Sequence, residues 1–196
     1  LQILPAGCSK TDVNGDGVSW WRSFYPDGSS GPGDDFLVYD NFNWALAGLE
    51  EAFILPQIDL STATNPMLYF YRSYNRRDQF TTDSLKIAVR ACGGNDVVLY
   101  AKGGLQLANS AATYPATFWT PNLPSDWIRD SLDLTSFAGE EAVTISFINK
   151  GYSGQLLYID DFRIMETGTT SLQEPQQVEF SIFPNPATTK LYIRGN

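Results

Sequence analysis

Short apolar runs, separated by clusters of Gly, Pro, Asn and Asp, divide this chain over most of its length. Turn-forming clusters at such close intervals leave little room for helices and are typical of an antiparallel β-sandwich. Helical periodicity is nearly absent. The pattern predicts an all-β fold, a two-sheet antiparallel β-sandwich of the jelly-roll kind, with strands at residues 35–39, 52–60, 67–74, 84–91, 96–101, 116–120, 127–133, 142–149 and 155–165.

The side-chain pattern within these runs indicates how they lie in the sandwich. Residues 84–91 and 142–149 alternate apolar and polar side chains with a period of two, so each is expected to bury one face. Residues 67–71 are apolar on both faces, which predicts a central position in a sheet. The only helix-like stretch, 132–139, is interpreted as a turn over the edge of the sandwich.

The composition excludes several classes of function. With 196 residues, the chain is long enough for one sandwich and a tail, and two enzymatic domains are not expected. A formal net charge of -9 argues against nucleic-acid binding, which needs clustered Lys and Arg. The absence of histidine removes the central group of Ser-His-Asp triads, Cys-His dyads and most zinc sites. No apolar run is long enough to span a membrane.

The two ends of the chain read differently from its body. The N-terminus at Leu1 lacks a signal-peptide pattern, so the chain is interpreted as part of a longer precursor with an export signal and further domains upstream. Residues 1–166 are predicted to form the sandwich. Residues 167–177 have too few apolar side chains to offset the entropy of ordering the chain and are predicted to be a linker. Alternation resumes in residues 178–196, which are expected to begin a second small β-unit.

The two cysteines, Cys8 and Cys92, are too far apart in sequence for a CxxC redox or zinc motif. In an oxidising compartment they could pair and close a long loop, which would contribute roughly 4 kcal/mol in the loop-entropy model. Two separate thiols are the alternative. Sequence spacing does not decide between them, because a disulfide depends on the geometry of the fold.

A cation site is suggested by the segment Asp-Val-Asn-Gly-Asp-Gly at residues 12–17. Asp12, Asn14 and Asp16 supply oxygens at every second position, the spacing that wraps a chain around calcium. The position of the final EF-hand glutamate holds Ser23, so an EF-hand is excluded and other oxygens must complete the site. The alternative is a turn rich in Asn, Asp and Gly, without a metal.

A pair of carboxylates, Asp160 and Asp161, interrupts the otherwise apolar run 155–165. Neighbouring side chains on a strand face opposite ways, so one carboxylate must turn toward the sandwich or its rim. Burying that charge requires an Arg partner, backbone donors or a metal. We expect both carboxylates to contribute to the same calcium site as the early loop, with a salt bridge as the alternative.

Five aromatic side chains lie in Gly- and Ser-rich segments, where flat rings can stack on sugars. Aromatic residues in loops also cap the ends of sandwiches, which is their commoner role. The predicted ligand-binding residues are Trp20, Trp21, Tyr25, Trp44 and Tyr152.

Taken in order, several segments resemble the cleaved-adhesin and anchor-type jelly-roll modules of secreted Bacteroidetes-type proteins, which are relatives of the MAM-like sandwiches. The resemblance implies calcium at one end of the sandwich, between the early loop and the late Asp pair, and no catalysis. It covers almost all of residues 4–165 and is carried by residues 4–7, 12–20, 53–61, 83–89, 127–134 and 157–161.

Residues 180–193, with Phe-Pro-Asn-Pro at 183–186, resemble the first half of a type IX secretion sorting domain. This resemblance implies a secreted or cell-surface protein that is handled by the type IX secretion machinery.

Two functions fit these observations. The first is an adhesion or carbohydrate-binding module, stabilised by calcium, whose ligand is a glycan or a surface protein. The second is a structural spacer beside a secreted metalloprotease or other hydrolase. A glycosidase would need two carboxylates across a cleft, and the acidic pairs at 34–35, 50–51 and 140–141 read as solvated surface instead.

Overall fold

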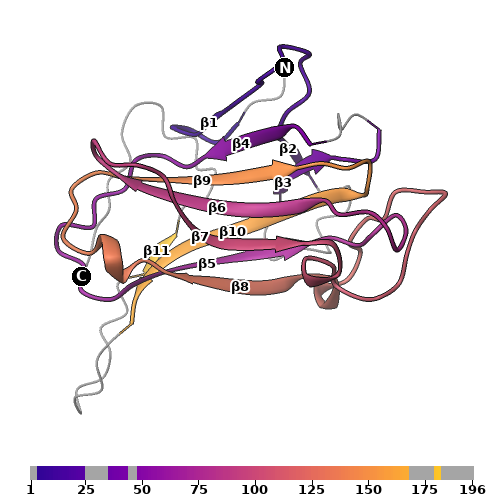
Figure 1. The fold of residues 1–196 in the computed structure, drawn as a ribbon. Coiled ribbons are helices and arrows are strands. Elements are labelled where there is room, and N and C mark those ends of the chain that lie inside the picture. The colour runs from indigo at the N-terminus through magenta and orange to yellow at the C-terminus, as the bar shows by residue number, and fades with distance from the viewer. Residues whose placement is uncertain (1–3, 25–34, 44–47, 168–178, 182–196) are drawn as a thin grey trace.

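A computed structural model describes residues 4–24, 35–43, 48–167 and 179–181. Two antiparallel sheets pack face to face in it (Figure 1). Within the described ranges the helical structure is limited to three short 3-10 turns, at Gly104–Gln106, Pro124–Asp126 and Thr135–Phe137. The all-β, two-sheet sandwich predicted from the sequence is therefore confirmed.

One sheet has five strands in the order β1-β4-β9-β6-β7. Its interior strands alternate buried and partly exposed side chains, most regularly in β9, as a sheet with one face on a core requires. The strands span Ser9–Lys10 (β1), Glu50–Ile54 (β4), Ser84–Ala91 (β6), Val97–Gly103 (β7) and Val143–Lys150 (β9).

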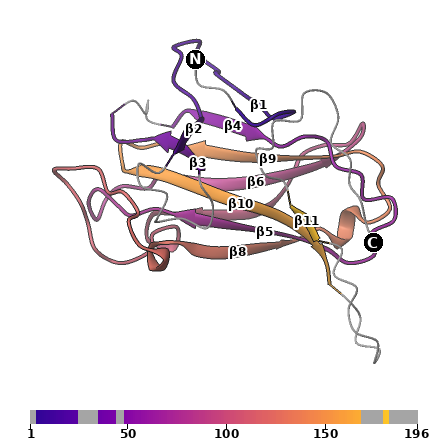
Figure 2. The same cartoon turned by 180° about the vertical axis from the view of Figure 1, so that it is seen from behind.

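The second sheet follows the order β2-β3-β10-β5-β8, and a short sixth strand, β11, pairs with the end of β10 (Figure 2). Its strands span Trp21–Phe24 (β2), Asp35–Asp40 (β3), Pro66–Ser73 (β5), Ile128–Asp133 (β8), Leu156–Glu166 (β10) and Glu179–Ser181 (β11).

The core lies between the two sheets and is rich in aromatic rings. Phe147 of β9 packs edge-on against Phe162 of β10, with ring centroids 4.9 Å apart, and against Phe70 of β5 at 5.3 Å. Burying a phenylalanine side chain contributes about 1.5–3 kcal/mol, so these contacts hold the sheets together.

Most predicted strands are confirmed within one or two residues, and the exceptions have physical reasons. Residues 67–71 do lie inside a sheet, because β5 is flanked by β10 and β8. The strand predicted at 52–60 ends at Ile54, shortly before Pro56, which cannot donate to a ladder. The strand predicted at 116–120 is wrong, because that segment crosses the sheet surface without pairing. The short β1 and β2 were not predicted.

The turn predicted near 132–139 is confirmed as the short 3-10 turn Thr135–Phe137 after β8. None of the described helical segments is long or apolar enough to cross a membrane. The boundaries predicted for the linker and the second β-unit stay predictions. Part of that unit, β11, adds to the second sheet, and the rest of 178–196 lies outside the described residues.

Candidate functional site

The outer face of the second sheet carries a hydrophobic cluster separate from the core. Leu37 and Leu157 point into the core, so their neighbours Val38 and Tyr158 point outward. Trp21 lies opposite Val38 in the ladder and extends the cluster toward the edge of the sheet. We call this surface the aromatic face; its members are Trp21, Phe36, Val38, Tyr71, Trp119, Trp127, Leu156 and Tyr158.

The aromatic face has a buried floor and a partly exposed rim. In the floor, Phe36 packs edge-on against Tyr158, with centroids 5.3 Å apart, and Trp127 meets the same ring at 6.4 Å. Trp119 also contacts the Tyr158 ring, with centroids 6.4 Å apart. Trp119, Trp21 and Tyr71 are only half-buried, so part of each ring remains accessible to a ligand.

Gln155 holds the segment that carries Trp119 in place. Its side chain is fully buried, its amide donates to the carbonyl oxygens of Tyr114 (2.6 Å) and Thr117 (2.9 Å), and its Oε1 accepts from Trp119 N at 2.8 Å. Tyr158 Oη also donates to Trp119 O at 3.1 Å. These bonds replace the ladder that the sequence predicted for residues 116–120, and they hold the backbone of Trp119 in place without a strand.

Charged groups lie among these rings. Across the sheet, Asp160 of β10 is opposite Tyr71 of β5, and Tyr71 is opposite Arg129 of β8. The exposed Arg129 guanidinium stacks over Tyr69, 4.3 Å from the ring centroid. The face therefore combines flat apolar surface with hydrogen-bond donors and acceptors.

Asp160 and Asp161 lie at an irregularity of β10, where one extra residue interrupts the ladder to β5. Asp161 has a φ of 49°, a left-handed conformation that is uncommon for a side chain other than glycine. Its carboxylate pairs with Arg163 at 2.9 Å, while Asp160 accepts from the Asp161 N–H at 2.7 Å. For Asp161, the salt bridge that the sequence left open is the arrangement found.

The early acidic loop lies elsewhere. Val13 N and Thr11 Oγ1 donate to the buried Glu51 carboxylate, at 2.7 and 2.9 Å. The loop therefore adjoins the start of β4. Asp160 belongs to β10 of the other sheet, four residues after the first residue of that strand, Leu156. Its side chain points outward from that sheet. Four residues correspond to about 13 Å along a strand.

The two halves of the predicted calcium site consequently do not fit one ion. Within the loop, Asn14 donates its amide to Asp16 at 2.7 Å, and Asp12 accepts from Gly17 N at 3.0 Å. In the described ranges, no group of three or more acidic or Cys side chains is close enough to hold a metal. The prediction that Asp160 and Asp161 complete the loop site is wrong, because the strand register carries them to a different face.

Acidic side chains of the loop and of neighbouring strands nevertheless lie near Tyr39. Burial raises the pKa of Tyr39, and the charges of Glu51, Asp16, Asp12 and Asp40 raise it further. Among the ion pairs of the described residues, none involves any of these four carboxylates. The phenol of Tyr39 thus lies near several carboxylates that form no ion pair with another described residue.

The predicted aromatic ligand residues divide into three groups. The prediction that Trp20 binds a ligand is wrong, because its side chain is fully buried. The ring packs edge-on against Tyr39, with centroids 5.5 Å apart, and the indole N–H donates to Glu51 O at 3.0 Å. Trp21 lies on the aromatic face, and Tyr152 is exposed in the loop after β9. Tyr25 and Trp44 lie outside the described residues.

The sequence did not single out Tyr71, Trp119, Trp127 or Arg129 for the candidate site. The apolar outer side of residues 67–71 was the available signal, since a solvent-facing sheet normally places polar residues there.

Of the two alternatives that the sequence left open for the cysteines, the structure has the two separate thiols. Cys8 and Cys92 are both free. Cys8 immediately precedes β1 and Cys92 follows β6, and two strands, β4 and β9, separate β1 from β6. Three strand spacings amount to about 14 Å, whereas bridged cysteines have Cα atoms less than about 7 Å apart.

Comparison with solved structures places this arrangement among known folds. The K1 cleaved adhesin domain of Lys-gingipain from Porphyromonas gingivalis superposes with a TM-score of 0.54 at 19% identity, over 84% of this chain and 94% of that domain. The chain has the cleaved-adhesin fold. The K3 domain of the same protein gives a TM-score of 0.55 at 17% identity, over 82% of this chain and 92% of that domain.

The cleaved-adhesin fold is thus shared at the level of structure, as the resemblance of the sequence predicted. The K2 domain of Lys-gingipain agrees, with a TM-score of 0.50 at 20% identity over 80% of this chain. No family model and no curated protein matches the sequence.

Proposed function

We propose that this chain is a non-catalytic carbohydrate-binding or adhesion module of a larger exported protein, and that the aromatic face binds its ligand. The observation that carries the proposal is the set of half-buried rings, Trp21, Tyr71 and Trp119, packed against a buried aromatic floor. An outer sheet face of a soluble sandwich usually carries polar side chains. Contiguous apolar surface rimmed by polar groups instead marks an interaction site.

The chemistry of this face suits a sugar. A pyranose presents an apolar face of C–H groups that can stack on an aromatic ring, and hydroxyl groups at its edge that need donors and acceptors. Half-exposed indole and phenol rings supply the first contact. Arg129, exposed and stacked over Tyr69, supplies N–H donors beside them. The floor beneath is packed, which fixes the ring positions before a ligand arrives.

The fold comparison supports the proposal by analogy. The similar structures are adhesin domains of a larger protein, Lys-gingipain. A shared fold does not determine function, so the aromatic face itself is the stronger support for binding.

A glycan array probed with the intact chain tests the proposal. We expect binding to one class of glycan, and a loss of about tenfold in affinity for Tyr71→Ala and for Trp119→Ala, since a ring contact contributes on the order of 1 kcal/mol. Phe80→Ala is the matched control, because Phe80 is 79% exposed in a loop between β5 and β6, outside the aromatic face.

Two outcomes count against a binding face. Equal losses in the Tyr71, Trp119 and Phe80 variants would remove the aromatic face from the explanation. If the parent protein and all three variants bind neither a glycan nor a surface protein, the structural spacer is favoured instead.

We also propose that calcium binds the early loop, through oxygens of Asp12, Asn14 and Asp16. The support is the charge of the carboxylates near Tyr39 and the lack of a basic partner for Asp12 and Asp16 among the described ion pairs. Carboxylate oxygens are the ligands that calcium prefers. A bound cation would offset the mutual repulsion of these charges.

Export by the type IX route is the remaining part of the proposal. It rests on the sequence of the tail, Phe-Pro-Asn-Pro at residues 183–186, which lies outside the described residues. Replacing Pro184, Asn185 and Pro186 by alanine in the natural precursor should reduce its secretion from the cell without changing its synthesis. Undiminished secretion of that variant would refute this part.

A further inference from the structure

The longest strand, β10, has different partners along the two halves of one edge. Its first half, Leu156–Ile159, pairs with β3. The ladder to β3 ends there, and the irregularity between Asp160 and Arg163 follows directly. An extra residue bends a strand and increases its twist, so it separates the second half of β10 from the line of β3. Without a further strand on this side, the second half of β10 would present an edge that no other described strand pairs with.

A short segment from the tail of the chain occupies this edge. Arg163, Ile164 and Met165 pair antiparallel with Ser181, Phe180 and Glu179, respectively. In Figure 2, β11 lies beside the end of β10, on the side away from β5. The pairing is three residues long, whereas β10 and β5 share seven register positions.

The edge is held in shape without β11. On its other side, β10 pairs with β5 as far as Glu166 opposite Pro66. The Glu166 carboxylate accepts backbone N–H groups of Thr64 (2.8 Å) and Asn65, and Thr167 N donates to Asn65 O at 3.0 Å. These bonds anchor the end of β10 to the loop before β5, so the edge is organised before a strand arrives.

We propose that Arg163–Met165 is a strand-acceptor site, and that its ligand is the segment Glu179–Ser181 of the same chain, bound in a detachable way. Within the described residues β11 pairs with β10 alone, and residues 167–178 separate it from the sandwich. A short ladder at the end of such a connection opens without disturbing the core. Exposed edges of this kind accept extended segments by adding a strand.

Docking of β11 goes beyond the proposed function, since it depends neither on a glycan nor on the secretory role of the tail. The docked segment Glu179–Ser181 has a defined place on the module. While β11 is docked, an edge that would attract strands of other molecules is covered.

Amide hydrogen exchange of the intact chain tests the site. Phe180→Pro removes one N–H and distorts the ladder, whereas Phe180→Ala keeps the backbone donor. Thr167 N donates toward β5, so the N–H groups of Met165 and Arg163 also point toward β5 and that of Ile164 points toward β11. We expect the Ile164 amide to exchange at least tenfold faster in Phe180→Pro than in Phe180→Ala. The amides of residues 156–159 should keep their rates. Unchanged protection of the Ile164 amide, or faster exchange along the whole of β10, would overturn the proposal.

Paired cysteines test the register and the source of the strand. In a background with Cys8→Ser and Cys92→Ser, the pair Met165→Cys with Glu179→Cys should form an intramolecular disulfide several times faster than Met165→Cys with Ser181→Cys. The first pair is opposed in the ladder and the second is offset by two residues. Equal rates would refute the register, and disulfide-linked dimers as the main product would refute docking within one chain.

Discussion

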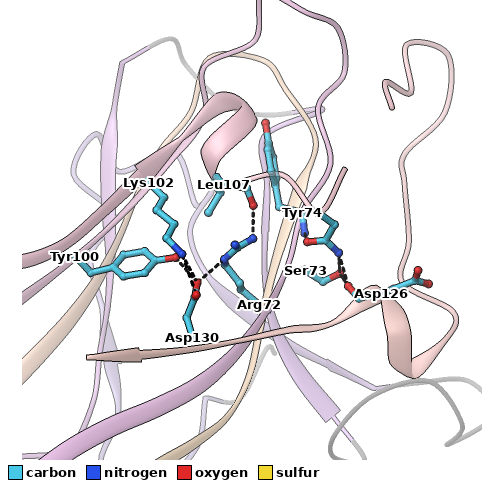
Figure 3. A network of polar contacts seen from close by, with 9 residues as sticks. Arg72, Ser73, Tyr74, Tyr100, Lys102, Leu107, Asp126 and Asp130 are labelled. Carbon is cyan, nitrogen blue, oxygen red and sulfur yellow. Dashed lines mark hydrogen bonds and ion pairs between the residues drawn. The ribbon is translucent and has the colours of Figure 1, made fainter. Parts of the chain in front are cut away.

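Arg72 of β5 and Asp130 of β8 meet on the inner side of the second sheet, with Arg72 Nε 2.6 Å from Asp130 Oδ2. The same carboxylate accepts hydrogen bonds from Tyr100 Oη at 2.6 Å and from Lys102 Nζ at 2.8 Å (Figure 3). Tyr100 and Lys102 belong to β7 of the other sheet. The Asp130 carboxylate therefore joins the two sheets at their β7 and β8 edges, where Arg72 is only 3% exposed.

Asp130→Asn is expected to lower the free energy of unfolding by about 3 kcal/mol, because it leaves the buried Arg72 without its counterion. Denaturation by urea measures the change. Asp133→Asn is the matched control on the same strand, since Asp133 is exposed and accepts only a local bond from Thr135. A control loss as large as that of Asp130→Asn would contradict the assigned role.

The same carboxylate predicts a dependence of stability on pH. Burial acts to raise the pKa of Asp130, but the hydrogen bonds from Lys102, Tyr100 and Arg72 together lower it below its ordinary value of 3.8. A carboxyl whose folded-state pKa is lowered stabilises the protein above its unfolded pKa, and this contribution disappears as the pH falls. Stability should decline below about pH 4, and Asp130→Asn should lose less stability there than the parent protein. Parallel acid profiles would refute this.

Gly154→Ala should destabilise the protein by at least about 2 kcal/mol, as overpacking beside a buried group does. A methyl group at Gly154 would lie 1.8 Å from Asp83 Oδ2. The buried Asp83 carboxylate cannot easily yield, because it accepts N–H groups of Tyr152 (2.6 Å) and Gln155 (3.0 Å). Thermal unfolding measures the effect.

Gly139→Ala is the comparison for this glycine. Nothing lies within 4 Å of a methyl group at Gly139, and only its φ of 88° disfavours the substitution. Its cost should stay near 1 kcal/mol. Equal costs for the two variants would show that the contact with Asp83 is unimportant.

Calcium should raise the midpoint of thermal unfolding by several degrees relative to a chelator, because an ion that binds only the folded state stabilises it. Asp12→Ala should reduce this shift. Asp161→Asn should leave it unchanged, since Asp161 pairs with Arg163 on the outer face of the second sheet. Identical melting curves with calcium and chelator would end the proposal for the loop.

Both thiols should be free in the purified protein. Cys92 is exposed, so it should react quickly with a thiol reagent. Burial raises the pKa of Cys8 to about 12, so little thiolate is present at neutral pH and Cys8 should react mainly after unfolding. An intact mass two daltons lower without reductant, together with no titratable thiol, would indicate the disulfide instead.

The sequence alone determined the fold class and most of the strands. Alternation along residues 84–91 and 142–149 is a local property, since side chains on one strand face opposite ways whatever lies beside it. The turn-forming clusters that separate the strands act within a few residues. The sequence predicted a strand at residues 116–120, but side-chain hydrogen bonds hold this segment instead. One of them comes from Gln155, which is distant in the sequence, so the segment itself could not reveal it.

Only the tertiary structure decided which of these strands and side chains meet. Strand order placed β4 and β9 between the two cysteines, and register carried Asp160 and Asp161 away from the early loop. It also gathered Trp21, Tyr71 and Trp119, which lie far apart in the sequence, on one face. The physical reason is that pairing between strands is set by the packing of the whole sandwich, whereas alternation and turns are set by neighbouring residues.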